Sequence, residues 1–236
     1  MNDRVTRVES AVVSGQRPRA AFLARTYNHL LGAIIAFIGV EVVLFQTGIA
    51  QQIAQFVFGV GKGWLLILGG FMVASYLFNS LAQNRGSKAV QYAGLGGFVV
   101  AEALLFAAPL YYAWAMMSPD VVKNAALFTL VAFAALTAIV YYTGKDFTFL
   151  RSFVLWGGVI ALGTIVLGAL TGFHLGTFFT VAMIGYAGAS ILYTTSSVLQ
   201  DYPDGYHVSA ALALFSAVML MFWYVLQFVM SIAGSD

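Results

Sequence analysis

The chain has 236 residues, of which 61% are hydrophobic and only 8% are charged, and its net charge is +2. Soluble domains carry about 25% charged residues, so this composition excludes a water-soluble globular protein and indicates a protein embedded in lipid. The sequence has no cysteine, which excludes disulfide bonds, thiolate metal sites and a cysteine nucleophile.

The N-terminal segment is polar and carries several arginines. A cleaved secretory signal places an apolar core within its first twenty or so residues, whereas the first apolar run here opens only after Arg25. We therefore expect residues 1–25 to be a retained, flexible cytoplasmic tail and residues 26–236 to form one membrane domain.

Seven apolar runs follow, each close to the roughly 20 residues that a spanning helix needs. The runs show no two-residue alternation, which disfavours a β-barrel. The predicted fold is an all-α integral membrane protein, a bundle of seven transmembrane helices. The predicted spans are residues 26–45, 64–81, 89–110, 124–142, 153–170, 177–198 and 208–232.

The basic residues are distributed unevenly between the two sides of this predicted bundle. The tail and the loops after the second and fourth spans hold nine of the eleven lysines and arginines, while the opposite loops hold only Lys62 and Lys123. Because cytoplasmic segments are enriched in basic residues, we expect a cytoplasmic N-terminus. Residues 200–207, predicted to lie on the same side, contain no lysine or arginine.

Two acidic residues lie inside the predicted spans, Glu41 in the first and Glu102 in the third, within "GGFVVAEALLFAAPLYYA". At about 1.5 Å per residue they reach similar depths in the outer half of the membrane. A charge there costs at least about 2.5–3.5 kcal/mol, so each carboxyl must be protonated, paired, or in contact with water or a cation. If the two helices adjoin, the carboxyls could share a proton or a cation. Alternatively, each is neutral and hydrogen-bonds a backbone carbonyl, or Glu41 snorkels outward.

Other features of the sequence carry less chemistry. Pro109 lacks a backbone donor and is expected to kink or end the third span. Hydroxyl side chains gather near the end of the sixth span, but none of His29, His174 and His207 pairs convincingly with a serine, so we expect no catalytic site. No metal, phosphate or nucleic-acid motif is visible, and no cofactor is expected.

Four stretches together resemble a known family. They are "RTYNHLLGAIIAFIGVEVV", "GGFVVAEALLFAAPLYYA", "YYTGKDFTFLRSF" and "ILYTTSSVLQDYPDGYHVSAALALF". Over about residues 22–230 the chain resembles the Bax inhibitor-1 family and is most similar to its bacterial YccA-type branch. The resemblance implies a multi-pass protein of the bacterial inner membrane, with seven helices and the last one central.

The resemblance leaves two functions open. Many family members act as pH-sensitive calcium leaks governed by two aspartates, which align with Thr194 and Ala217; neither is acidic here. A leak would then depend on Glu102 and Glu41, as candidate sites for protons or cations. YccA-type members resemble regulators and slow substrates of the membrane-bound ATP-dependent protease FtsH, for which the charged tail would be a handle. Lipid is the expected surrounding in either case.

Overall fold

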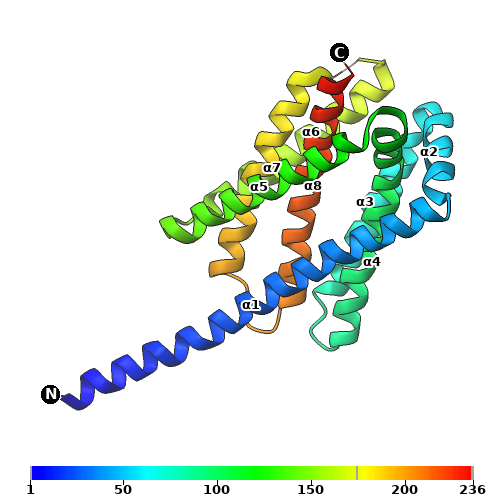
Figure 1. Cartoon of the computed structure of the whole chain (residues 1–236). Helices are drawn as coiled ribbons and strands as arrows, with labels where there is room; N and C mark the ends of the chain where they lie inside the picture. The colour runs from blue at the N-terminus through cyan, green and yellow to red at the C-terminus, as the bar shows by residue number, and fades with distance from the viewer. Residues whose placement is uncertain (1, 174, 235–236) are drawn as a thin grey trace.

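The computed structural model describes residues 2–173 and 175–234, and within these the chain forms helices joined by short turns, with no strand (Figure 1). The helices are α1 (Asn2–Gln46), α2 (Ile49–Gly59), α3 (Trp64–Ala82), α4 (Lys88–Tyr111), α5 (Pro119–Thr143), α6 (Arg151–Thr171), α7 (Gly176–Gln200) and α8 (His207–Ala233), with short helical turns η1 (Gly61–Gly63), η2 (Tyr112–Met117) and η3 (Thr148–Leu150).

Seven helices are long and apolar enough to cross a membrane, which confirms the predicted all-α bundle. Each overlaps one of the seven predicted spans. The described termini lie at opposite ends of the molecule, as an odd number of spans requires.

Helix α1 is continuous from Asn2, so the expected tail and the first span share one helical backbone. Its N-terminal part extends away from the rest of the bundle (Figure 1). Whether this segment is flexible in the cell stays a prediction. The side chains of residues 2–18 and of Lys62 lie outside the described part of the chain, as does residue 174.

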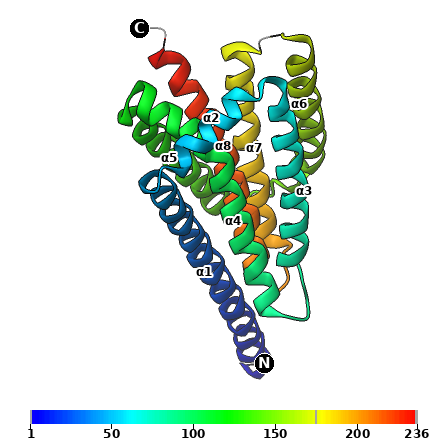
Figure 2. The same ribbon diagram turned by 90° about the vertical axis from the view of Figure 1, so that its right-hand side faces the viewer.

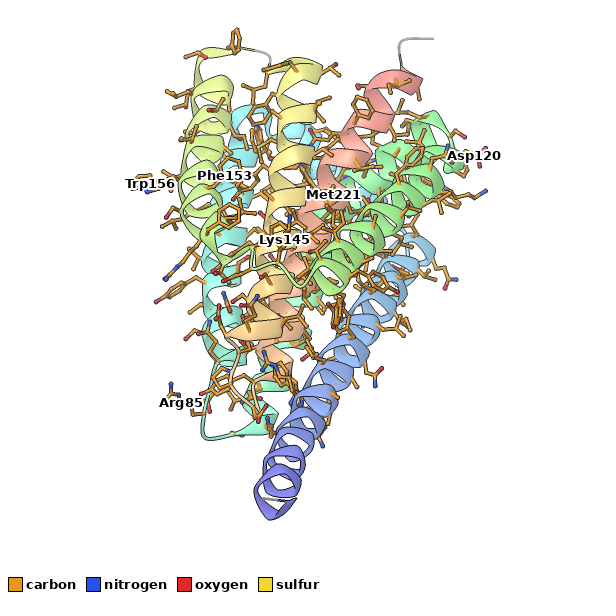
Figure 3. The ribbon with its side chains drawn as sticks, turned by 90° about the vertical axis from the view of Figure 1, so that its left-hand side faces the viewer. Arg85, Asp120, Lys145, Phe153, Trp156 and Met221 are labelled. Atoms are coloured by element: carbon orange, nitrogen blue, oxygen red, sulfur yellow. The ribbon has the colours of Figure 1, made fainter. Side chains whose placement is uncertain are left out.

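Helix α8 lies at the centre and contacts α1, α3, α4, α5 and α7 (Figure 2). Alanines such as Ala210, Ala211 and Ala217 are buried along it, and small side chains let neighbouring backbones approach closely in lipid. Met221, in the interior of Figure 3, is only 2% exposed, whereas Trp156 on α6 points outward and is 64% exposed. The central last helix agrees with the family resemblance.

The structure corrects one expectation about local structure and adds detail around Pro109. Residues 49–59, expected in the loop between the first two spans, form α2, which is too short to span a membrane. Ala50 and Ala54 of α2 pack inward, whereas Phe56 is exposed. The apolar residues of this stretch recur with the period of a helix, but the stretch is shorter than a membrane span. Pro109 does not end its helix: α4 continues to Tyr111 and passes into π-helical turns over η2. Such local adjustment can satisfy the backbone groups that proline frees in a membrane helix.

Candidate functional site: a cavity beside Glu102

A cavity of about 1860 Å³ is lined by residues of α2, α3, α4, α6, α7 and α8 and of the turns η1 and η2. Figures 2 and 3 both place α3 and α6 on the same side of the bundle, where they flank the inner helices. The lining extends from the α6–α7 turn and Gly234, at the end of the bundle away from the N-terminus, to Asn79 on α3 and Leu212 on α8, toward the other end. Its side chains include Phe71, Ser75, Tyr76, Phe98, Glu102, Phe106, Thr180, Ser216, Trp223 and Tyr224.

Glu102 is part of the cavity wall and is only 6% exposed. Phe98, Glu102 and Phe106 are spaced four residues apart, which puts them on one face of α4, and all three line the cavity. Among the described residues, no hydrogen bond or ion pair reaches the Glu102 carboxyl group. Glu102 is therefore a polar group of the cavity wall without a partner among the described residues.

Aromatic contacts hold the helix turns on either side of Glu102. The ring of Phe98 lies 6.3 Å from that of Phe71 on α3. The ring of Phe106 stacks on Phe222 at 5.3 Å and meets Trp223 edge-on at 5.1 Å. Since aromatic pairs at these separations are attractive beyond their burial, they fix the face of α4 that carries Glu102.

Glu41 occupies a different environment. It is 7% exposed, and neither of its carboxyl oxygens has a hydrogen-bond partner. One turn earlier, the Phe37 ring packs edge-on against Phe106 of α4 at 5.6 Å. Helices α1 and α4 thus adjoin as the shared-proton hypothesis requires, but no hydrogen bond joins the two carboxyls, and Glu41 is not among the residues that line the cavity. Its burial also argues against outward snorkelling.

The two positions aligned with the family aspartates lie elsewhere. Thr194 is half-buried on α7, six residues before that helix ends, and Ala217 is buried on α8. Next to Thr194, the Thr195 hydroxyl is buried without a hydrogen-bond partner. Neither position carries a carboxyl, so the two aligned aspartates have no acidic counterpart at these positions.

Sequence reasoning missed a contact at the N-terminal end of the bundle, made by Arg19 and called the clamp below. Arg19 of α1 donates three hydrogen bonds to main-chain carbonyls, at 2.6 Å to Val198, 3.0 Å to Leu199 and 2.6 Å to Tyr202. The last carbonyls of a helix lack partners within it, and Arg19 supplies them for α7. From the sequence, this arginine contributes only to the predicted orientation of the chain in the membrane.

A second basic residue holds the same loop from another side. The Lys88 ammonium group donates to the Gly205 carbonyl at 2.6 Å and to Gln91 Oε1 at 3.1 Å. The loop at residues 201–206, which contains no lysine or arginine, therefore receives its cationic partners from α1 and α4. Contacts between residues far apart in the chain leave no signal in a single sequence.

The turn between α5 and α6 docks on α7 through Ser196. The Ser196 hydroxyl accepts a hydrogen bond from the Phe147 backbone N–H at 2.9 Å and donates one to Asp146 Oδ1 at 3.3 Å. The pKa of Asp146 is lowered, first by the Thr148 backbone N–H and then by the Thr148 and Ser196 hydroxyls, which stabilise its charged form. This docking positions the family-like segment "GKDFTFL".

The histidines form no catalytic pair with a serine among the described residues. His29 places Nδ1 at 2.6 Å from the Arg25 carbonyl and Nε2 at 2.9 Å from the Tyr92 hydroxyl, and its ring lies 4.9 Å from that of His207. These contacts join α1, α4 and α8. Within the described residues, no group of three His, Cys, Asp or Glu is placed to hold a metal ion.

Comparisons with known proteins agree with this architecture. The family model described as "Inhibitor of apoptosis-promoting Bax1" matches residues 19–234. The match begins at Arg19, the clamp residue of α1. The chain is also similar to an uncharacterized protein of Pseudomonas aeruginosa, with 28% identity over 120 residues, and spans about half the length of that curated relative (52%, and 50% of this chain). With the family match extending over nearly all of the bundle, this multi-pass membrane protein belongs to the Bax inhibitor-1 family.

Proposed function

We propose that this protein is a YccA-like interaction protein of the bacterial inner membrane that engages and modulates the membrane-bound ATP-dependent protease FtsH. The observation that carries the proposal is the course of α1, whose N-terminal part extends away from the bundle (Figure 1). A protease that pulls substrates from the membrane needs an accessible chain segment to grip, and a projecting, charge-rich segment offers one.

Arg19 anchors α1 to the bundle next to this projecting segment, residues 2–18, which we call the handle. Its three hydrogen bonds to the end of α7 and the burial of Phe22, which is 4% exposed, anchor α1 from residue 19 onward. Deleting residues 2–18 would remove the handle and keep both anchors. A longer deletion through residue 22 would also remove Arg19 and Phe22. A change in half-life would then not distinguish loss of recognition by the protease from loss of folding.

The experiment compares the half-lives of the full chain and the 2–18 deletion in cells with and without FtsH. The proposal expects the full chain to decay faster when FtsH is present and the deletion to persist in both strains. A matched control replaces residues 2–18 by a neutral segment of equal length. Equal half-lives of all forms in the presence of FtsH would contradict the proposal.

A second candidate is a proton-sensitive cation leak, and the position of Glu102 in the cavity wall favours it. Its test is calcium and monovalent-cation flux into liposomes from about pH 5 to about pH 8. If Glu102 belongs to the gate, Glu102→Gln shifts the pH dependence, while Glu41→Gln, at a site away from the cavity lining, leaves it in place. An unshifted curve for Glu102→Gln removes Glu102 from the gate.

A further inference from the structure

The cavity has the chemistry of a binding site for an organic cation. Its described lining contains one carboxyl group, that of Glu102, and no lysine, arginine or histidine. The other titratable side chains that line it are tyrosines: Tyr76 on α3, Tyr112 in η2 and Tyr224 on α8. Among the described residues, the only carboxyl available to a ligand here is that of Glu102, a residue that is 6% exposed and whose carboxyl has no protein partner there.

Aromatic side chains make up much of the remaining wall. Phe98 and Phe106 line the cavity one turn before and one turn after Glu102, with Phe71 of α3 and Trp223 of α8 beside them. The faces of aromatic rings attract cations, most strongly when the site is desolvated. A carboxylate framed by aromatic rings is thus complementary to a positive charge carried on an apolar body.

The same wall suits a small metal ion poorly. Calcium takes six to eight oxygen ligands, but the cavity offers one carboxyl group and a few scattered hydroxyls and amides, among them Ser75, Thr180, Ser216 and Gln227. Its volume of about 1860 Å³ exceeds the roughly 300–1,000 Å³ of a usual small-molecule site. The dimensions and the apolar lining both favour a bulky hydrophobic ligand.

We propose that this cavity binds lipophilic organic cations, such as quaternary phosphonium or hydrophobic amine compounds, with Glu102 as the counter-ion and the rings of Phe98, Phe106 and Trp223 as the apolar and cation–π surface. Binding does not require the chain to conduct ions or to contact a protease. The proposal therefore stands apart from both functions considered above.

The experiment measures binding of tetraphenylphosphonium to the purified full chain in lipid nanodiscs. Tetraphenylborate, which has nearly the same shape and the opposite charge, controls for simple partition into lipid. The proposal expects saturable binding of the cation and none of the anion. It also expects binding to weaken as the pH falls, because a proton and the cation compete for one carboxylate. Equal uptake of both ions, or uptake that never saturates, would overturn it.

Variants locate the site. Glu102→Gln should weaken binding by about tenfold or more, the value of a charge-assisted contact, and Glu102→Asp should retain part of the affinity. The matched control is Glu41→Gln, which neutralises the other buried acid without changing the described cavity lining, and it should bind like the wild type. If Glu102→Gln fails to fold, the cation-against-anion comparison on the wild type decides. Unchanged affinity in a folded Glu102→Gln would overturn the proposal and leave the cavity to lipid chains.

Discussion

The guanidinium of Arg19 lies 2.6 Å from the main-chain carbonyl oxygen of Val198, at the other end of the sequence. This contact joins the start of the first membrane helix to the end of the sixth.

Arg19→Ala should destabilise the protein by about 1.5–3 kcal/mol, the value of hydrogen bonds to a charged group. Three carbonyls at the end of α7 and in the following loop would lose their donor. The measurement is thermal unfolding in detergent, with Arg25→Ala as a control at an exposed position on the same helix. Equal effects of the two substitutions would show that the clamp contributes nothing specific.

Gly94→Ala should destabilise the packing of α3 against α4 by about 1–3 kcal/mol, the cost of overpacking. A Cβ at this position would collide with the Ala82 backbone nitrogen and lie 2.6 Å from the Phe78 carbonyl oxygen, and neither backbone atom can move aside easily. Gly96→Ala is the control on the same helix, because nothing lies within 4 Å of its added Cβ. There the change should be neutral or stabilising, by up to about 1 kcal/mol. Similar losses from both variants would contradict this packing.

Glu41→Leu should leave stability unchanged or raise it by about 1–3 kcal/mol, because it removes two buried oxygens that lack hydrogen-bond partners. The measurement is again thermal unfolding, with Glu41→Gln as the isosteric comparison. A marked loss of stability in Glu41→Leu would mean that the carboxyl has a stabilising partner, such as a buried water, that this account lacks.

Ser196→Ala should release the α5–α6 turn, because the half-buried Phe147 N–H loses its acceptor, at a cost of about 0.5–1.5 kcal/mol. The pKa of Asp146 is lowered in the folded state, so its contribution is present above the ordinary value of 3.8 and is lost as pH falls through the lower folded value. Hydrogen exchange of residues 144–150 should therefore accelerate in Ser196→Ala at neutral pH, and in the wild type only below about pH 3.8. Unchanged exchange in the variant would contradict the docking.

Much of the fold could be predicted from the sequence because lipid imposes length and composition on every span. The seven apolar runs and the two isolated acids are visible by reading along the chain. Two features needed the structure. The short helix α2 has the period of a helix but not the length of a span. The hydrogen bonds of Arg19 join it to residues about 180 positions away in the chain.

The candidate site shows the same division. Glu102 was conspicuous as a charge among apolar residues, but its cavity is formed by six of the described helices and depends on how they pack. Because Glu41 and Glu102 lie at similar depths in the membrane, the sequence suggests that their carboxyls share a proton or a cation. In the structure, their helices turn the two side chains toward different surroundings. Depth follows from residue number, whereas the direction of a side chain around its helix depends on the neighbours of that helix.

The most direct test of the proposed function is photocrosslinking in living bacteria, with a photoreactive amino acid at Val8 in the projecting part of α1. The matched control position is Phe178, which is 88% exposed at the opposite end of the bundle. We expect a crosslink to FtsH from position 8 and none from position 178. The crosslink from position 8 should be lost when residues 2–7 and 9–18 are replaced by a neutral segment. Crosslinks of equal strength from both positions, or none from position 8 when FtsH is abundant, would contradict it.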